Sequence, residues 1–266
     1  MTKTKTLSIE AELVLINAKK KMEDIGWAMQ GLNKFGNVIE NKLELLPKKQ
    51  QQWLQELSFK VLHSVVRSNL FSMKKNGAKS APWNKTYKAL VTSSGAIGGA
   101  FGATAFAVDL GITTKLMMRS IMDIARSEGE DLNELDTQLA CLQVFALGGK
   151  SKHDNSLETG YYASRITLGS AVKGGTKALS SLVSGSANPI IQALAVIASR
   201  FSIQVSEKFV AQAVPVLGAA GGASINLAFL NHFQQMAQAH FAIRGLEREY
   251  GEEAVKAAYE NLEVKH

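Results

Sequence analysis

Hydrophobic residues recur at helical spacing in the N-terminal part of the chain. Over residues 7–46 they return every three or four positions, and Ser8 is placed to cap the first turn. Three glycines in this stretch argue against a single uninterrupted helix, and Pro47 ends or restarts the pattern. A second amphipathic stretch covers residues 50–71. Both stretches predict helices that pack an apolar face on the rest of the protein.

Three long stretches carry no Asp, Glu, Lys or Arg: Ala89–Val108, Ala178–Ser199 and Phe209–Ile243. Each is long enough to span a membrane. However, glycine, serine, threonine and amide side chains dilute them, and the mean hydropathy of the whole chain is only −0.01. Buried helices therefore fit better than membrane spans, and no long β-branched alternation is present to form a sheet. The sequence predicts an all-α, compact helical protein.

Small residues recur at four-residue spacing in two of these stretches. Gly95 and Gly99 share one helix face, and so do Gly218 and Gly222. Glycines placed four apart let a second backbone approach closely, so we expect two glycine-zipper helical hairpins. Such a hairpin packs helix on helix, lines an acyl-chain cavity or enters a bilayer. In both halves a Gly-Gly-Ala motif is followed by a glycine about 30 residues later, which suggests a pseudo-twofold relation.

The positive charge is concentrated in the N-terminal third. The net charge is +7, but residues 1–88 hold 16 Lys and Arg against 7 Asp and Glu. We accordingly divide the chain into basic amphipathic helices over residues 1–84, packed on the body, and a helical core over residues 85–266. A basic region on a near-neutral body favours an anionic partner surface, and a solvated helical face is the alternative.

Lysines interleaved with aromatic residues indicate where an anionic surface would bind. Aromatic rings lie at the headgroup boundary of a bilayer, while lysines reach the phosphates. Paired arginines are nearly absent from this stretch, which disfavours nucleic acid as the partner. The expected membrane-surface residues are Lys74, Lys75, Lys79, Trp83, Lys85 and Tyr87.

The chain offers few groups for catalysis. Its single cysteine, Cys141, lies in an apolar run and excludes an internal disulfide. The sequence lacks the phosphate-loop, nucleophile-elbow and zinc-helix motifs, so we expect no metal and no cofactor. A hydrolase that uses His153 or His232 is an alternative, and it requires a pocket with a serine or carboxylate beside the histidine.

Polar residues inside the apolar stretches are the candidates for ligand contact. A buried carboxylate is costly unless it is paired, so Asp109 should meet a basic residue or a ligand headgroup. Its candidate basic partners are Lys115, Arg165 and Arg200. His232 and His240 lie eight residues apart, too far for the usual metal pair, which favours hydrogen-bonded histidines. The candidate ligand-binding residues are Asp109, Asn231, His232 and His240.

The C-terminal part of the chain carries the most specific pattern. The run SEKFVAQAVPVLGAAGGA at 206–223 resembles the bacterial EcsC family, as do Asn226, Phe229, His232-Phe233, His240-Phe241 and RGLEREYG at 244–251. The glycine run that ends at Asp109 and residues 160–165, GYYASR, are also similar to that family's pattern. The resemblance covers roughly residues 85–255. It departs at Gly111, since many relatives have a proline soon after the aspartate.

The resemblance implies an α-helical bacterial protein, in a family named for a gene that neighbours an ABC transporter, and it supplies no catalytic residues. The first thirty residues contain no signal-peptide core, which indicates the cytoplasm. We therefore expect a cytoplasmic protein, peripheral to the inner face of the cell membrane, that binds a lipid or acyl chain. The alternatives are the hydrolase and a helical partner of an integral membrane complex.

Overall fold

The computed structural model describes residues 6–23, 36–69, 82–98, 102–147, 161, 162, 165, 189–213 and 222–262. Within these ranges it has nine α-helices, one short 3-10 helix and no strand, so the all-α prediction is confirmed. The helices are α1 (Ile9–Glu23), α3 (Gly36–Glu44), α4 (Lys48–Asn69), α5 (Asn84–Gly98), α6 (Gly102–Ser127), α7 (Leu135–Gln143), η1 (Val144–Ala146), α10 (Pro189–Ala213), α12 (Gly222–Tyr250) and α13 (Glu252–Asn261).

The first helices begin at the signals that the sequence carries. The backbone N–H of Ala11 donates to Ser8 Oγ at 3.2 Å, which caps α1. Pro47 immediately precedes α4, and its carbonyl accepts the backbone N–H of Gln51 at 3.1 Å. A proline has no N–H to give to a preceding turn, so it suits the start of a helix. Within its described residues, 7–23 and 36–46, the stretch over residues 7–46 contains helices α1 and α3.

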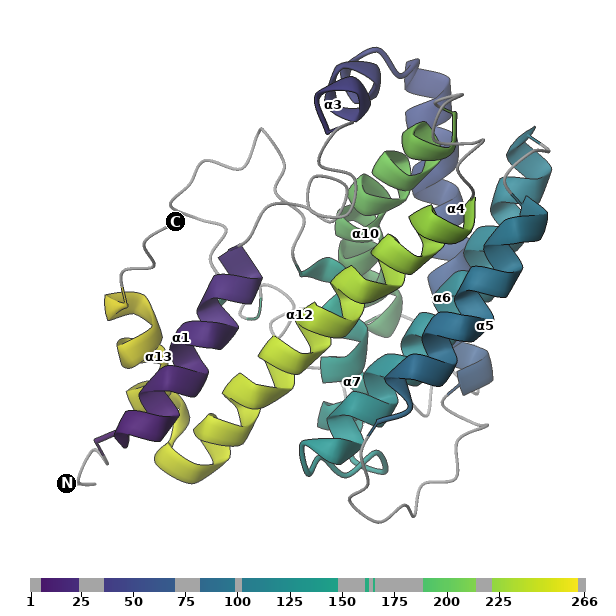
Figure 1. Ribbon diagram of the computed structural model, residues 1–266. Helices are drawn as coiled ribbons and strands as arrows, with labels where there is room; N and C mark the ends of the chain where they lie inside the picture. The colour runs from purple at the N-terminus through teal and green to yellow at the C-terminus, as the bar shows by residue number, and fades with distance from the viewer. Residues whose placement is uncertain are drawn as a thin grey trace.

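The long helix α12 crosses the molecule and connects its two sides (Figure 1). It packs against α5 and α6 on one side and against α1 and α13 near its C-terminal end, while α10 packs on α4. Four fully buried phenylalanines fill the space between η1, α10 and α12, with ring centroids 5.1 to 6.1 Å apart. Aromatic burial of this size dominates a core, and it makes the described fold compact. The four are Phe145, Phe201, Phe229 and Phe233.

Two glycines with positive φ make the chain turn at helix ends. Gly129 follows α6 with φ 86°, and Gly251 joins α12 to α13 with φ 95°. At the first, Glu130 N–H donates to Ala125 O at 3.0 Å and Gly129 N–H to Arg126 O at 3.1 Å. This is the Schellman pattern, in which a left-handed glycine satisfies the last carbonyls of a helix.

The uncharged stretches contribute to α5, α6, α10 and α12. No helix in the described part of the chain is long and apolar enough to cross a membrane. Gly95 lies within α5, and Gly222 is buried at the first residue of α12. Gly99 and Gly218 lie outside the described residues, so the zipper contacts remain a prediction. The division of the chain at residue 84 is likewise untested.

Candidate functional site

Asp109 of α6 and Lys208 of α10 form a fully buried ion pair. Lys208 Nζ donates to Asp109 Oδ2 at 2.8 Å, and the two side chains are 0% and 2% exposed. Asn226 Nδ2, on α12, donates to the other carboxylate oxygen at 2.7 Å. Thr113 and Gln212 lie at the edge of hydrogen-bond distance, each 3.4 Å from a carboxylate oxygen. Both oxygens of Asp109 are thus occupied by groups of the chain itself.

Aromatic rings surround this pair and exclude water from it. Lys208 Nζ lies 5.2 Å from the ring centroid of Phe229 and 5.9 Å from that of Phe106. Phe106 also packs against Trp53 and Phe209, with centroids 6.1 and 5.1 Å away. Burial lowers the pKa of the Lys208 ammonium, while the charge and hydrogen bond of Asp109 oppose this. The ion pair, together with the hydrogen bond from Asn226, therefore joins α6, α10 and α12 within the core.

The prediction that Asp109 is paired is confirmed, but the three predicted partners are wrong. Arg165 binds Glu247 of α12 instead. Lys115 lies on the exposed side of α6, six residues after Asp109 and away from the buried face that carries the aspartate. Lys208 is found 99 positions further along the chain, and only the tertiary fold brings it to Asp109.

His232 and His240 are buried and hydrogen-bonded, as expected. His240 Nδ1 and Tyr161 Oη are 2.8 Å apart, while His232 meets the backbone of Leu147. Burial lowers the pKa of His232 to about 4, against a smaller opposing effect of the Leu147 hydrogen bond, and lowers that of His240 well below its usual value. Both imidazoles are neutral at pH 7. Their Nε2 atoms and Asn231 Oδ1 have no hydrogen-bond partner in the described structure.

Three tyrosines form a cluster next to His240, with Tyr161 in direct contact with the imidazole. Tyr161, Tyr162 and Tyr259 pack with ring centroids 5.0 to 5.6 Å apart. Tyr162 Oη donates to Glu247 Oε1 at 2.8 Å, and Arg165 pairs with the same carboxylate. Because the hydroxyl groups of Tyr161 and Tyr162 are both bound to side chains of α12, we assign these two tyrosines a structural role.

A second ionic network ties the C-terminal half of α12 to the turn after α6. Arg244 Nε donates to Glu130 Oε1 at 2.9 Å, and Arg248 binds the same oxygen. Burial raises the pKa of Glu130, but the hydrogen bonds and charge of Arg244 outweigh it and hold that pKa below its usual value. This network was missed in the sequence. The four-residue spacing of the two arginines was the available signal.

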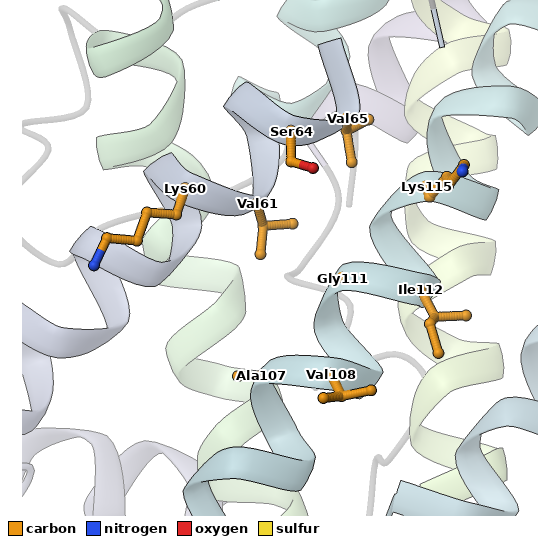
Figure 2. A pocket seen from close by; sticks show the side chains of 9 residues that line it. All are labelled: Lys60, Val61, Ser64, Val65, Ala107, Val108, Gly111, Ile112 and Lys115. Carbon is orange, nitrogen blue, oxygen red and sulfur yellow. The ribbon is translucent and has the colours of Figure 1, made fainter. Parts of the chain in front are cut away.

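A groove opens to solvent between α4 and α6 (Figure 2). Its volume is about 410 Å³. The valines of α4 line one wall and Val108 and Ile112 of α6 line the other, with Gly111 between them (Figure 2). A Cβ at Gly111 would meet no atom within 4 Å, so the glycine borders open space. The lining residues are Lys60, Val61, Ser64, Val65, Ala107, Val108, Gly111, Ile112 and Lys115.

Both helices of this α4–α6 groove carry a positive charge. Lys60 of α4 and Lys115 of α6 are both lining residues, and the Lys60 side chain extends away from α6 (Figure 2). Lys60 Nζ forms an exposed ion pair with Glu56 at 3.8 Å, which is a weak interaction in water. Val108 and Ile112 are exposed large hydrophobic residues of α6. Apolar walls with a cation on each helix suit an elongated apolar ligand with an anionic group.

The predicted membrane-surface residues are only partly described. Trp83, the residue before α5, is largely exposed, and Lys85 beside it is exposed. They border a shallow hollow of about 550 Å³ over residues 82–86. Tyr87 is half-buried and packs on the core, where burial raises its pKa. Lys74, Lys75 and Lys79 lie outside the described residues.

The comparison with family models identifies the chain. The model of the EcsC protein family matches residues 13–246. The chain belongs to the EcsC family. Neither the curated proteins nor the solved structures contain a match to it.

In this EcsC chain, the residues that carried the resemblance have structural partners. Asn226, Phe229 and Lys208 enclose Asp109, while His240 binds Tyr161. Gly251 supplies the left-handed turn between α12 and α13. Among the described residues, no group of three His, Cys, Asp or Glu side chains is placed to hold a metal ion. His153, the other histidine of the hydrolase hypothesis, lies outside those residues.

Proposed function

We propose that this EcsC-family protein is a peripheral membrane protein of the inner face of the cell membrane, and that it holds the apolar chain of a lipid or acyl ligand in the α4–α6 groove. The groove is the observation that supports this most strongly. Ligand sites are concave and mostly apolar, with volumes of about 300 to 1,000 Å³. The α4–α6 groove falls in that range and leaves Val108 and Ile112 in contact with water.

The lysines that line the groove define the ligand further. An apolar chain would cover the two exposed side chains of α6 and gain about 25 cal/mol for each Å² removed from water. Its anionic head would lie at Lys60 or Lys115, because the exposed Lys60–Glu56 pair costs little to rearrange. The proposed ligand therefore has one apolar chain and one carboxylate or phosphate head.

The membrane contact is proposed for the segment that leads into α5. Trp83 is exposed there beside Lys85, and the sequence places Lys74, Lys75 and Lys79 just before it. An indole ring lies at the headgroup level of a bilayer, and each nearby lysine adds about 1 kcal/mol of attraction to anionic lipid. This segment would hold the groove close to the membrane that supplies its ligand.

The glycine-zipper hairpins belong to the same proposal. Gly95 and Gly99 would let the α5–α6 hairpin pack closely, and Gly218 and Gly222 would do the same at the start of α12, in a pseudo-twofold arrangement. Without large side chains at these positions, helices approach closely and dispersion contacts increase. The support for this is the buried position of Gly222 and the matching order of glycines in the sequence.

Filling the groove tests the ligand. We expect the protein purified without detergent to carry a lipid or fatty acid in native mass spectra, and Gly111→Phe to lose it, because the ring would occupy the open space at Gly111. Gly111→Ala is the matched control. It should keep the ligand and unfold with a free energy about 0.5 to 1 kcal/mol higher, since glycine disfavours a helix interior. Equal lipid binding by Gly111→Phe would contradict the proposed site.

Vesicle sedimentation tests the membrane contact. Lys85→Gln should weaken binding to anionic vesicles about fivefold, the equivalent of about 1 kcal/mol, and added salt should weaken the parent as well. Replacing Lys74, Lys75 and Lys79 together by Gln should weaken it by one to two orders of magnitude, for about 2 to 3 kcal/mol. Lys256→Gln on α13 is the charge-matched control. A protein that ignores anionic vesicles but binds DNA with a steep salt dependence would contradict the membrane contact.

A further inference from the structure

Helix α1 is apolar on two opposite faces. Ala11, Leu15 and Ala18 are buried on the inner face, where α1 packs on α12. On the outer face Ile9, Leu13 and Ile16 are 79%, 62% and 40% exposed. Single exposed hydrophobic residues are ordinary, but three on one stripe of one helix indicate an interaction surface.

The helix that carries this outer stripe is firmly held. Lys19 Nζ donates to the carbonyl oxygens of Tyr259 and Leu262, both at 2.7 Å, and lies 4.9 Å from the Tyr259 ring centroid. Tyr250 Oη bonds Ser8 Oγ at 3.2 Å at the other end of α1. Figure 1 shows α1 beside α12 and against α13 at one end of the molecule. Because α1 is already held in place, a partner that binds this stripe pays no free energy to order the helix.

The spacing of the stripe matches a helix seam. Ile9, Leu13 and Ile16 are followed by Lys20, so the intervals are four, three and four residues, as at the core positions of a coiled coil. Glu10 and Glu12 flank the start of the stripe, and Lys20 and Lys21 lie at its end. The helix is therefore acidic at one end and basic at the other.

We infer that the outer stripe of α1 binds the same stripe of a second copy of this chain, with the two helices antiparallel. A twofold axis near the middle of the stripe would place Leu13 against Ile16 of the second copy, and the glutamates at one end against the lysines at the other. The surface is then complementary to itself, as a twofold interface requires. A parallel pair would instead bring like charges together.

The charges also favour a second copy over a bilayer. Glu10 and Glu12 are exposed beside the stripe and would be repelled by anionic headgroups. One pair of 15-residue helices buries less than the roughly 1,000 Å² of a stable interface. The dimer should therefore be weak and reversible.

Sedimentation equilibrium over about 1 to 500 µM protein tests the stripe. The parent should pass from monomer to dimer across this range, and Leu13→Ser should stay monomeric. Leu45→Ser is the matched control, because Leu45 is a leucine as exposed as Ile9 but lies after α3. It should dimerise as the parent does. Circular dichroism and thermal melting of both variants would confirm that the fold is intact.

Charge reversal tests the antiparallel register. Glu10→Lys and Lys20→Glu should each dimerise at least tenfold more weakly, because each substitution creates two pairs of like charges across the dimer interface. An equimolar mixture of the two should recover the parental dimer, since both contacts of the mixed pair are then attractive. Neither a bilayer nor an unrelated partner protein can produce this recovery.

Three results would overturn the inference. They are a parent that stays monomeric throughout the range, a Leu13→Ser variant that dimerises like Leu45→Ser, and a mixture of charge variants that dimerises no better than its components. If Leu13→Ser lowers vesicle binding while the parent stays monomeric, the stripe is a membrane contact and not a dimer seam.

Discussion

At the scale of single residues, the Asp109–Lys208 pair is a fully buried pair of charges in the core. Moving two charges from water into a protein interior carries a penalty of several kcal/mol for each ion, which their attraction and hydrogen bonds must offset. The 2.8 Å contact with Lys208 and the 2.7 Å bond from Asn226 supply that compensation. The partners therefore depend on each other, and the loss of one leaves an uncompensated charge.

This dependence predicts non-additive mutations. Lys208→Met should lower the free energy of unfolding by about 3 to 5 kcal/mol, because it leaves the carboxylate of Asp109 buried without a cation. The double variant Asp109→Asn with Lys208→Met should recover most of that loss, since no buried charge remains. Denaturant unfolding of the parent, both single variants and the double variant measures the coupling. If the loss of stability in the double variant equalled the sum of the losses in the two single variants, the two side chains would act independently.

At the scale of elements, the sequence shows where helices begin, but it does not show which helices pack against one another. Ser8 and Pro47 mark the starts of α1 and α4 because capping and the missing proline N–H act within one helical turn. The partner of Asp109 could not be found this way, since Lys208 lies 99 positions away on α10. Sequence reasoning therefore predicted that the carboxylate is paired but chose the wrong cations.

The α4–α6 groove was missed for the same reason. Its walls come from two helices that are far apart in the chain, and no periodicity shows where their packing leaves a gap. Gly111 was a usable signal. A glycine in a helix interior is unfavourable, and when nothing packs against it, it can keep a surface open. By contrast, Gly222, one of the glycines of the expected zippers, is buried at the first residue of α12.

At the scale of the whole molecule, three buried titratable groups set the pH dependence of stability. Burial lowers the pKa of His232 to about 4 and that of His240 well below its usual value. Burial raises the pKa of Glu207 to about 7, because its Oε2 has no hydrogen-bond partner in the described structure. The two histidines and the glutamate act in opposite directions over the same range of pH.

The sign follows from which state binds more protons. Between pH 6.5 and about 4.5 both histidines are protonated in the unfolded chain but neutral in the folded one, so they destabilise the fold as the pH falls. Glu207 is protonated in the folded state and ionised in the unfolded one over that range, so its contribution is present at low pH and is lost as the pH rises through 7. The unfolded chain thus binds about one more proton overall. Stability should fall by about 1.4 kcal/mol for each pH unit below 6.5.

Two variants separate these contributions. Glu207→Gln removes the opposing group, so the loss of stability on acidification should steepen to about 2.7 kcal/mol for each pH unit. His232→Gln removes one of the two histidines that bind a proton only in the unfolded state. The remaining histidine and Glu207 then cancel, so the stability should be nearly independent of pH between 6.5 and 5. Denaturant unfolding at half-unit steps from pH 8 to 4.5 measures the slope, which does not depend on the absolute stability of either variant. If Glu207→Gln left the slope unchanged, Glu207 would be ionised in both the folded and the unfolded state over this range of pH, which would contradict its raised pKa.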